Sequence, residues 1–278
     1  MAYLQLGLDA YSPREIAEKV QLVGVTKARL PFLQTAMLGI LAGAFIGLGA
    51  LYYTLVASDA TLGFAATRVL GGLVFSLGLI LVSVAGAELF TGNNLMVMAW
   101  ADRKITTAEL LRNWIIVYAA NAVGAAYVKI AVAKSTLPFS EAFFKGVLCN
   151  LLVCLAVWLA MAGHTVVDKI LAIVLPISAF VAAGFEHSVA NMYFIPLGIL
   201  SADTVTLPAS VNVASLGWSG LAANLVPVTL GNIVGGSVLV AAVYFVVYRQ
   251  HAFSEARTGT ERTRAADAAV PASPPKAG

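Results

Sequence analysis

The chain has 278 residues, of which 60% are hydrophobic and 11% are charged, and its formal net charge at pH 7 is +3. Soluble proteins carry about 25% charged residues, and so few charges cannot cover the surface of a soluble domain of this size. The composition therefore excludes a typical soluble enzyme, a nucleic-acid-binding protein and a disordered chain, and it favours a protein whose solvent is a lipid bilayer.

The N-terminal tail, residues 1–29, is more polar than the sequence that follows it. Ser12 is a typical capping residue, Pro13 suits the first helical position, and Glu15 lies three residues after the cap. Apolar residues then recur at near-helical spacing from Ile16 onward. This pattern predicts a short amphipathic helix that lies along the cytoplasmic surface of the membrane.

Six apolar segments follow, and about 20 residues are enough to span the hydrocarbon core as a helix. These segments are residues 31–57, 66–100, 108–132, 142–163, 166–200 and 220–249. The second and the fifth are too long for one simple span, and each is interrupted by glycine and a charged residue. We expect an all-α transmembrane channel domain over 30–250 and a disordered cytoplasmic tail over 251–278, because that tail has little with which to build a core.

Basic residues predict the orientation of the chain. Most of them lie in the two tails, in the linker after the second segment and in the loop before the fifth. The positive-inside rule places these regions in the cytoplasm, so both termini are expected there, in keeping with an even number of spans. Arg68 and Lys134 fall on the opposite side.

The two interrupted segments share a short pattern. Residues 86–93 (GAELFTGN) and 184–191 (GFEHSVAN) have Gly, Glu and Asn at the same internal spacing, and Asn121 and Asn232 begin similar runs in the third and sixth segments. Three spans per half make the second half enter from the opposite side, which predicts an inverted repeat with a broken helix in each half. Irregular backbone at membrane depth is tolerated where it lines a cavity, so we expect the breaks to meet at a pore.

Four ionisable residues lie at apparent membrane depth, where charge is costly and usually functional. His187 can donate and accept a hydrogen bond and titrates near physiological pH, although it can also be a satisfied core residue. Glu88 and Glu186 either line a cation pore or hold their loops in shape by accepting backbone N–H groups, and we favour the second role. Lys145 either snorkels to the interface or attracts anions.

Other residues near the breaks suit a narrow pore. The Thr91 hydroxyl can bind an anion or the partner loop. Phe75, Leu79 and Phe180 are bulky apolar residues that can form a constriction, or they pack in the ordinary way. The histidines and cysteines do not group into a metal site, and no nucleotide-binding motif is present. We therefore expect no metal, no cofactor and no enzymatic activity.

The motifs at the breaks resemble those of the formate/nitrite transporter family across about residues 10–250. The matching runs are 87–93 (AELFTGN), 145–150 (KGVLCN), 184–192 (GFEHSVANM) and 231–236 (GNIVGG). The resemblance implies a homopentamer of aquaporin-like protomers in the bacterial cytoplasmic (inner) membrane, with one pore per protomer. Such pores conduct formate, nitrite or hydrosulfide. The second-segment run looks like that of formate-uptake and hydrosulfide members. Formate is the expected substrate, with nitrite and hydrosulfide as alternatives.

The resemblance also implies residue roles. It makes His187 the central pore histidine, Thr91 a pore residue of the second segment, Lys145 the vestibule lysine and Asn232 a polar residue of the substrate pathway. The apolar constriction positions are Phe75, Leu79, Phe90 and Phe180. The residues expected to structure the loops are Glu88, Asn93, Glu186 and Asn191.

These roles predict a mechanism. A weak-acid anion collects near Lys145 and reaches the constriction, where it meets Thr91 and His187. Proton donation by His187, or by water that it orients, would let the anion cross the apolar neck as a neutral acid. The alternative within this class is a pH-independent anion channel in which His187 only polarises the site. Alternatives from other classes are a membrane scaffold without flux and a cation channel lined by Glu88 and Glu186.

Overall fold

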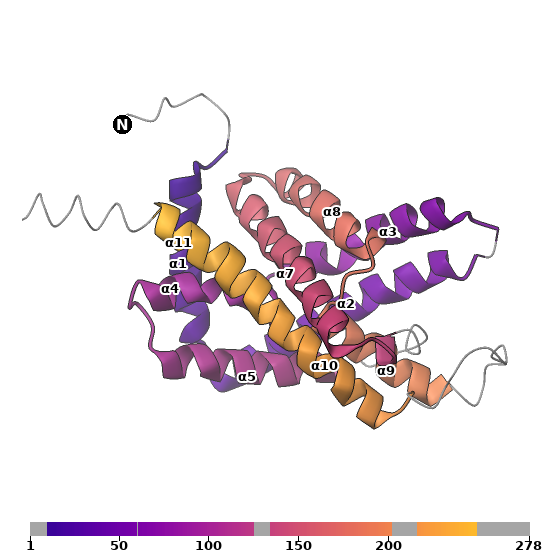
Figure 1. Cartoon of the computed structure of the whole chain (residues 1–278). Coiled ribbons are helices and arrows are strands. Elements are labelled where there is room, and N and C mark those ends of the chain that lie inside the picture. The colour runs from indigo at the N-terminus through magenta and orange to yellow at the C-terminus, as the bar shows by residue number, and fades with distance from the viewer. Residues whose placement is uncertain (1–9, 60, 125–133, 202–215, 249–278) are drawn as a thin grey trace, which may run out of the picture.

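The computed structural model describes residues 10–59, 61–124, 134–201 and 216–248, and every regular element in these ranges is a helix (Figure 1). In chain order the elements are α1 (Pro13–Ala28), α2 (Phe32–Ala57), α3 (Phe64–Ala85), η1 (Gly92–Met96), α4 (Val97–Ala101), α5 (Thr107–Gly124), α7 (Phe139–Ala162), α8 (Val166–Ala182), α9 (Ser188–Ser201), α10 (Trp218–Ile233), η3 (Val234–Ala242) and α11 (Val243–Tyr248). Within the described ranges, the helices begin and end close to the bounds predicted from hydropathy. The predicted tail 251–278 and residues 125–133 lie outside the described residues.

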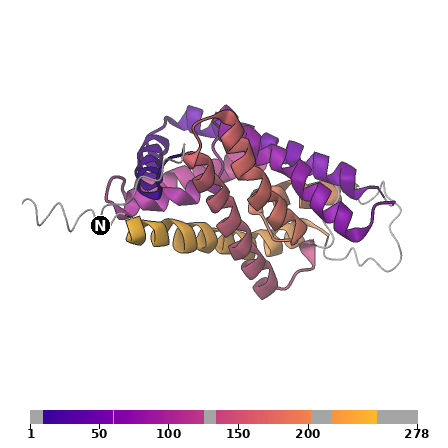
Figure 2. The same ribbon diagram turned by 90° about the horizontal axis from the view of Figure 1, so that it is seen from above.

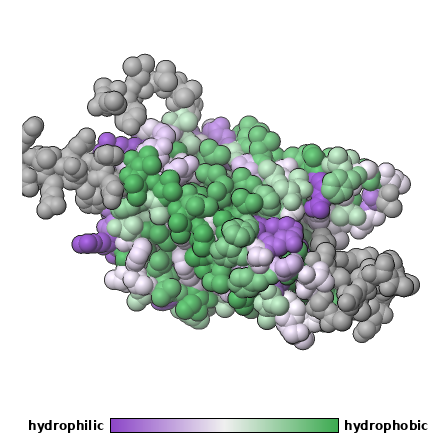
Figure 3. Space-filling model, viewed as in Figure 1, coloured by the Kyte–Doolittle hydropathy of each residue, from purple (hydrophilic) through white to green (hydrophobic). Residues whose placement is uncertain are grey.

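Four helical stretches are long and apolar enough to cross a bilayer among the described residues. They are α2, α3, α7 and the continuous run formed by α10, η3 and α11, and α9 is a shorter apolar helix. This last run extends along the length of the molecule in both views (Figures 1 and 2). The face in Figure 3 is mostly hydrophobic across its middle, and large apolar side chains such as Phe64 and Leu175 are more than two-thirds exposed. Such a surface requires a cover of lipid or of neighbouring apolar protein.

Helix α1 begins where the sequence predicts. The Ser12 hydroxyl accepts the backbone N–H of Glu15, and the Glu15 carboxylate accepts the backbone N–H of Ser12, which together form a capping box. The apolar side of α1 packs against the rest of the protein, and its place along the cytoplasmic surface of the membrane stays a prediction. Ile16 and Val20 are buried in a cluster that also contains Leu95 of η1. Contacts with the protein therefore cover the apolar side of this helix.

Helices α3 and α8 both end at a glycine in the left-handed region. Gly86 has φ +81° and Gly184 has φ +71°, values that residues with a Cβ rarely adopt. After Gly86 the chain is non-helical up to η1, and after Gly184 it is non-helical up to α9. The second and fifth predicted segments therefore each contain an interruption. We call residues 86–91 the first interruption and residues 183–187 the second interruption.

The largest buried apolar cluster surrounds these interruptions. It includes Phe75 and Leu79 of α3, Phe90 of the first interruption and Phe180 of α8, each at most 3% exposed. Helix pairs next to the cluster approach closely at glycines. A Cβ on Gly124 would overlap the backbone of α2, and one on Gly235 would overlap the backbone of α7. Because these glycines have no side chain, α5 packs closely against α2, and η3 packs closely against α7.

Candidate functional site

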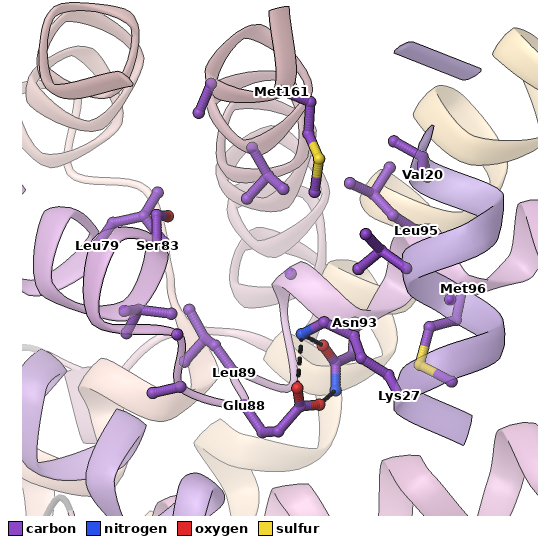
Figure 4. Close-up of a pocket in the computed structure, with 18 of the residues that line it drawn as sticks. Val20, Lys27, Leu79, Ser83, Glu88, Leu89, Asn93, Leu95, Met96 and Met161 are labelled. Atoms are coloured by element: carbon purple, nitrogen blue, oxygen red, sulfur yellow. Dashed lines mark hydrogen bonds and ion pairs between the residues drawn. The ribbon is translucent and has the colours of Figure 1, made fainter. Parts of the chain in front are cut away.

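A buried ion pair holds the first interruption. Glu88 Oε1 lies 2.8 Å from Lys27 Nζ, and the Glu88 side chain is 5% exposed. Asn93 Nδ2 donates to Glu88 Oε2 at 2.7 Å, and Lys27 Nζ donates to Asn93 Oδ1 at 2.9 Å (Figure 4). Asn113 accepts from Asn93 and donates its own amide to the Lys27 carbonyl. Helix α1 thus supplies the cation that neutralises a carboxylate of the first interruption.

The second interruption is held by a similar set of contacts, except that Asn191 Oδ1 has no hydrogen-bond partner among the described residues where Asn93 Oδ1 accepts from Lys27. Glu186 Oε1 lies 2.9 Å from Lys134 Nζ. Asn191 Nδ2 donates to Glu186 Oε2 at 2.6 Å and to Asn224 Oδ1 at 2.7 Å, and Asn224 donates to the Lys134 carbonyl. We expected both glutamates to accept backbone N–H groups of their own loops. In the described part of the chain, each carboxylate instead pairs with a lysine ammonium and accepts a hydrogen bond from an asparagine side chain.

One asparagine fastens each interruption to neighbouring helices. Asn121 Nδ2 donates to the carbonyls of Gly39 and Glu88 at 2.7 and 2.9 Å. Asn121 Oδ1 accepts the backbone N–H of Phe90 at 2.9 Å. The bonds to Phe90 and Glu88 satisfy backbone groups that the interruption would otherwise leave unpaired, and the bond to Gly39 ties Asn121 to α2.

Asn232 repeats this arrangement in the second half. Its Nδ2 donates to the carbonyls of Gly146 and Glu186 at 2.9 and 3.0 Å, and its Oδ1 accepts the Ser188 N–H at 3.0 Å. We expected Asn232 on the substrate pathway. Its exposure is 0%, both of its amide hydrogens are donated, and it lines neither of the pockets described below. The geometry makes Asn232 a clamp for the second interruption, and its place on the substrate pathway stays a prediction.

Thr91 and His187 bring the two interruptions together. Thr91 Oγ1 lies 3.1 Å from His187 Nε2, and both residues are buried. The backbone N–H of Ala190 donates to His187 Nδ1 at 3.1 Å. Because Nδ1 accepts, the neutral ring carries its proton on Nε2 and donates it to the threonine oxygen. The Cys154 thiol donates to the Thr91 carbonyl at 3.3 Å and supports the loop from behind.

A cationic pocket lies on the His187 side. It has a volume of about 210 Å³ and contains Arg68, Lys134 and Lys145 in its lining, together with His187 and aromatic residues. We call it the Arg68 pocket. Lys145 is predicted as the vestibule lysine and does line this pocket, but its Nζ lies 2.7 Å from Glu141 Oε1. The lysine that contacts the second interruption is Lys134, for which the sequence predicts only a place on the non-cytoplasmic side of the membrane.

A second pocket lies on the α1 side (Figure 4). It has a volume of about 250 Å³, and its lining includes Lys19, Lys27 and Lys169 as well as Glu88 and Leu79. We call it the α1 pocket. Both pockets therefore combine basic side chains with apolar walls, which is a lining that concentrates small anions.

Aromatic and aliphatic side chains separate the two pockets. The rings of Phe75 and Phe180 meet edge to face at 5.8 Å, and Phe180 stacks on His187 at 5.9 Å. Phe75 and Phe180 line the Arg68 pocket, whereas Leu79 lines the α1 pocket. Phe90, also expected at the constriction, lines neither pocket in the described residues.

The Phe90 ring packs instead against Trp114 at 6.0 Å and Tyr118 at 4.9 Å. In the ranges that the structure describes, no three His, Cys, Asp or Glu side chains lie close enough together to hold a metal ion.

Comparison with known proteins gives consistent matches. The family model described as formate/nitrite transporter matches residues 14–128 and 125–246. The formate channel FocA of Escherichia coli K12 is 39% identical over 271 residues, covering 86% of this chain and 95% of the relative. The formate channel FocA of Haemophilus influenzae is 37% identical, covering 89% and 98%.

Two solved structures are also similar. One is described as a pentameric formate channel with formate bound, with 37% sequence identity, a TM-score of 0.69, and coverage of 78% of this chain and 97% of that one. The other is described as an FNT family ion channel, with 30% identity, a TM-score of 0.73, and coverage of 84% and 98%.

Proposed function

Because the chain belongs to the formate/nitrite transporter family, we propose that it is a membrane channel for small monovalent anions, with formate as its main substrate. Formate is favoured because several relatives are named formate channels and one similar structure is described with formate bound. The observation that carries the proposal is the buried Thr91–His187 hydrogen bond, which lies next to two pockets lined by basic residues. Nitrite and hydrosulfide are the alternatives within the same class.

The proposed architecture has six spans in two inverted, aquaporin-like halves with broken helices two and five. The first half is α2, then α3 with η1 and α4, then α5, and the second is α7, then α8 with α9, then α10 to α11. The matched contacts of Glu88 and Glu186, and of Asn121 and Asn232, support this relation. The proposal includes cytoplasmic tails at 1–29 and 251–278, a bacterial inner-membrane location and a homopentamer, the last because a similar structure is described as pentameric.

A cation-conducting pore is disfavoured by the same contacts. Glu88 and Glu186 each lie within 3 Å of a lysine ammonium, so neither presents a free negative charge to a passing ion. The basic residues of the two pockets that lie within ion-pair distance of no described carboxylate, which are Arg68, Lys19 and Lys169, instead favour anions. A bare anion nevertheless pays heavily to enter the apolar neck formed by Phe75, Phe180 and Leu79.

Thr91 and His187 supply hydrogen bonds at this neck. The Thr91 oxygen accepts from Nε2 of His187, which leaves its hydroxyl hydrogen for a second hydrogen bond. Because Thr91 is fully buried and lines neither pocket, an anion must enter the neck to accept it. A proton on Nδ1 of His187 would meet the Ala190 N–H, because both groups would then be donors. We therefore assign His187 the role of a neutral donor that acts through Thr91. The proton that converts formate to formic acid comes from the bulk solution on the entry side and is released again when formic acid ionises on the exit side.

Formate uptake by the purified protein in liposomes tests this proposal. Replacing His187 with Phe or Asn should lower uptake by roughly tenfold or more, because the threonine loses its buried partner. His164, at the corner between α7 and α8, is a matched control, and its replacement should leave uptake unchanged. If uptake keeps its rate and pH dependence in both His187 variants, the role of this histidine is wrong.

A panel of formate, nitrite, hydrosulfide, acetate and chloride identifies the substrate. We expect formate to show the highest flux. A preference for nitrite or hydrosulfide would select the corresponding alternative, and the absence of any anion flux would favour a membrane scaffold.

A further inference from the structure

The Arg68 pocket contains one basic side chain that has no carboxylate partner among the described residues. Lys134 is paired with Glu186 and Lys145 with Glu141. Arg68 is within ion-pair distance of no described Asp or Glu, although it lines the same pocket as His187. An unpaired, half-buried guanidinium in a pocket that leads to the neck is available to a ligand.

The position of Arg68 is fixed by two contacts. Its guanidinium carbon lies 5.4 Å from the centre of the Phe64 ring, one turn earlier on α3, which covers the guanidinium with an aromatic side chain. Its Nη1 lies 3.3 Å from the point that a Cβ on Gly184 would occupy. A side chain at residue 184 would therefore crowd Arg68 as well as strain the left-handed backbone. Glycine lets the guanidinium nitrogen approach the second interruption.

The chemistry of this group differs from that of the lysines beside it. A guanidinium presents N–H donors in a planar fork that matches two oxygens on one atom, whereas an ammonium is a point charge without this preference. Formate and nitrite have two such oxygens, and hydrosulfide and chloride have none. We infer that Arg68 forms a receiving site in this pocket that favours two-oxygen anions over single-centre anions, a role that rests on the proposed anion-channel function.

Arg68 and Lys145 would then act differently on the anions that enter the Arg68 pocket. Lys145 carries a charge that Glu141 partly offsets, so its attraction is weak and acts alike on every anion, whereas Arg68 adds the preference for the oxygen pair. Acetate also carries the oxygen pair, so Arg68 does not separate it from formate, and the neck at Phe75 and Phe180 must exclude the larger anion.

Replacement of Arg68 by Lys or Gln tests the inference. In Arg68→Lys, which keeps the charge, the half-saturating concentrations of formate and nitrite should rise about three- to tenfold. Those of hydrosulfide and chloride should stay within about twofold, since an ammonium serves them equally well. In Arg68→Gln the half-saturating concentrations of all four anions should rise, and those of formate and nitrite should rise most. The preference for two-oxygen over single-centre anions can therefore be measured in either variant if the other does not assemble.

Two comparisons control for charge and for position. Lys145→Gln should weaken all four anions by a similar factor. Arg14, on the exposed start of α1, can be changed to Lys or Gln with no effect on any of them. A uniform change across the four anions in the Arg68 variants, or no change, would overturn the inference while formate flux through the wild-type protein still stands. Absence of formate flux in the wild type would instead reject the proposed function.

Discussion

The backbone N–H of Ala190 donates to Nδ1 of His187 at 3.1 Å, and this contact decides which ring nitrogen faces the other interruption. With Nδ1 accepting, Nε2 carries the proton and meets Thr91 Oγ1 at 3.1 Å. Leu89 and Val189 occupy the positions that match His187 and Thr91 in the other half. The matched residues therefore hold the interruptions in shape, whereas Thr91 and His187, which differ from their counterparts in the other half, are the residues that we propose act on the anion.

Replacing Thr91 with Val should stop transport without unfolding the protein. Valine keeps the shape but leaves the buried Nε2–H unpaired, which costs about 1–3 kcal/mol. We expect formate uptake to fall at least tenfold, whereas Thr91→Ser, which keeps the hydroxyl, should retain most of it. Thr54→Val is the control, because the Thr54 hydroxyl bonds only within α2 to Ala50. Equal uptake by the Val and Ser variants at residue 91 would show that the hydroxyl is not used.

The pair formed by Lys27 and Glu88 should couple α1 to the first interruption. Removing one partner of a buried pair costs about 3–5 kcal/mol, and partial exposure of Lys27 should lower this to about 2 kcal/mol. Glu88→Gln and Lys27→Met should therefore each lower the thermal unfolding temperature. The double variant should lose less than the sum of the two, which a double-mutant cycle measures. Additive losses would mean that the two side chains act independently.

Variants of Asn232 distinguish a residue that stabilises the second interruption from one that contacts the substrate. Asn232→Ala removes three hydrogen bonds to backbone groups and should destabilise the protein by about 3 kcal/mol. Asn121→Ala removes the matching three and should cause a similar loss. Thermal unfolding in detergent measures both. A variant at residue 232 that lowers flux but leaves stability unchanged would return this residue to the substrate pathway.

The start of α1 should be pH-dependent. Hydrogen bonds from Ser12 lower the pKa of Glu15 below its usual value near 4.5. A lowered pKa means that capping is complete above that usual value and is lost as the pH falls through the folded-state pKa. The protection of the first-turn amides from hydrogen exchange, measured relative to the intrinsic rate at each pH, should therefore be present at pH 7 and lost as the pH falls below 4.5. Ser12→Ala should lack this protection at both pH values, and Arg14→Ala, on the same turn, should behave as the wild type.

Local patterns predicted the helices well, because their signals lie within short stretches of sequence. The cap at Ser12 located the start of α1, and Gly86 and Gly184 located the ends of α3 and α8. Hydropathy gave helix bounds within a few residues for the described segments. The repeated Glu and Asn of 86–93 and 184–191 led directly to the two buried carboxylates.

The partners of those carboxylates were missed because they come from distant parts of the chain. Lys27 and Lys134 looked like topological charges beside apolar segments. A signal was present: Lys27 precedes Gly39 by the same number of residues as Lys134 precedes Gly146. The clamp role of Asn232 was also missed, because a polar residue near a pore and a polar residue that clamps a loop are alike in sequence. The packing of Phe90 against Trp114 and Tyr118 depends on residues more than twenty positions away, which no local pattern reveals.

Internal acidification of liposomes during formate entry tests the central claim most directly. An inward formate gradient is applied to the reconstituted wild-type protein, and a trapped pH indicator is followed together with formate uptake. Formate that crosses as the neutral acid should acidify the interior in step with uptake, well above protein-free liposomes, and His187→Phe should abolish both signals. Formate entry without acidification, or equal signals from the wild type and His187→Phe, would contradict the account.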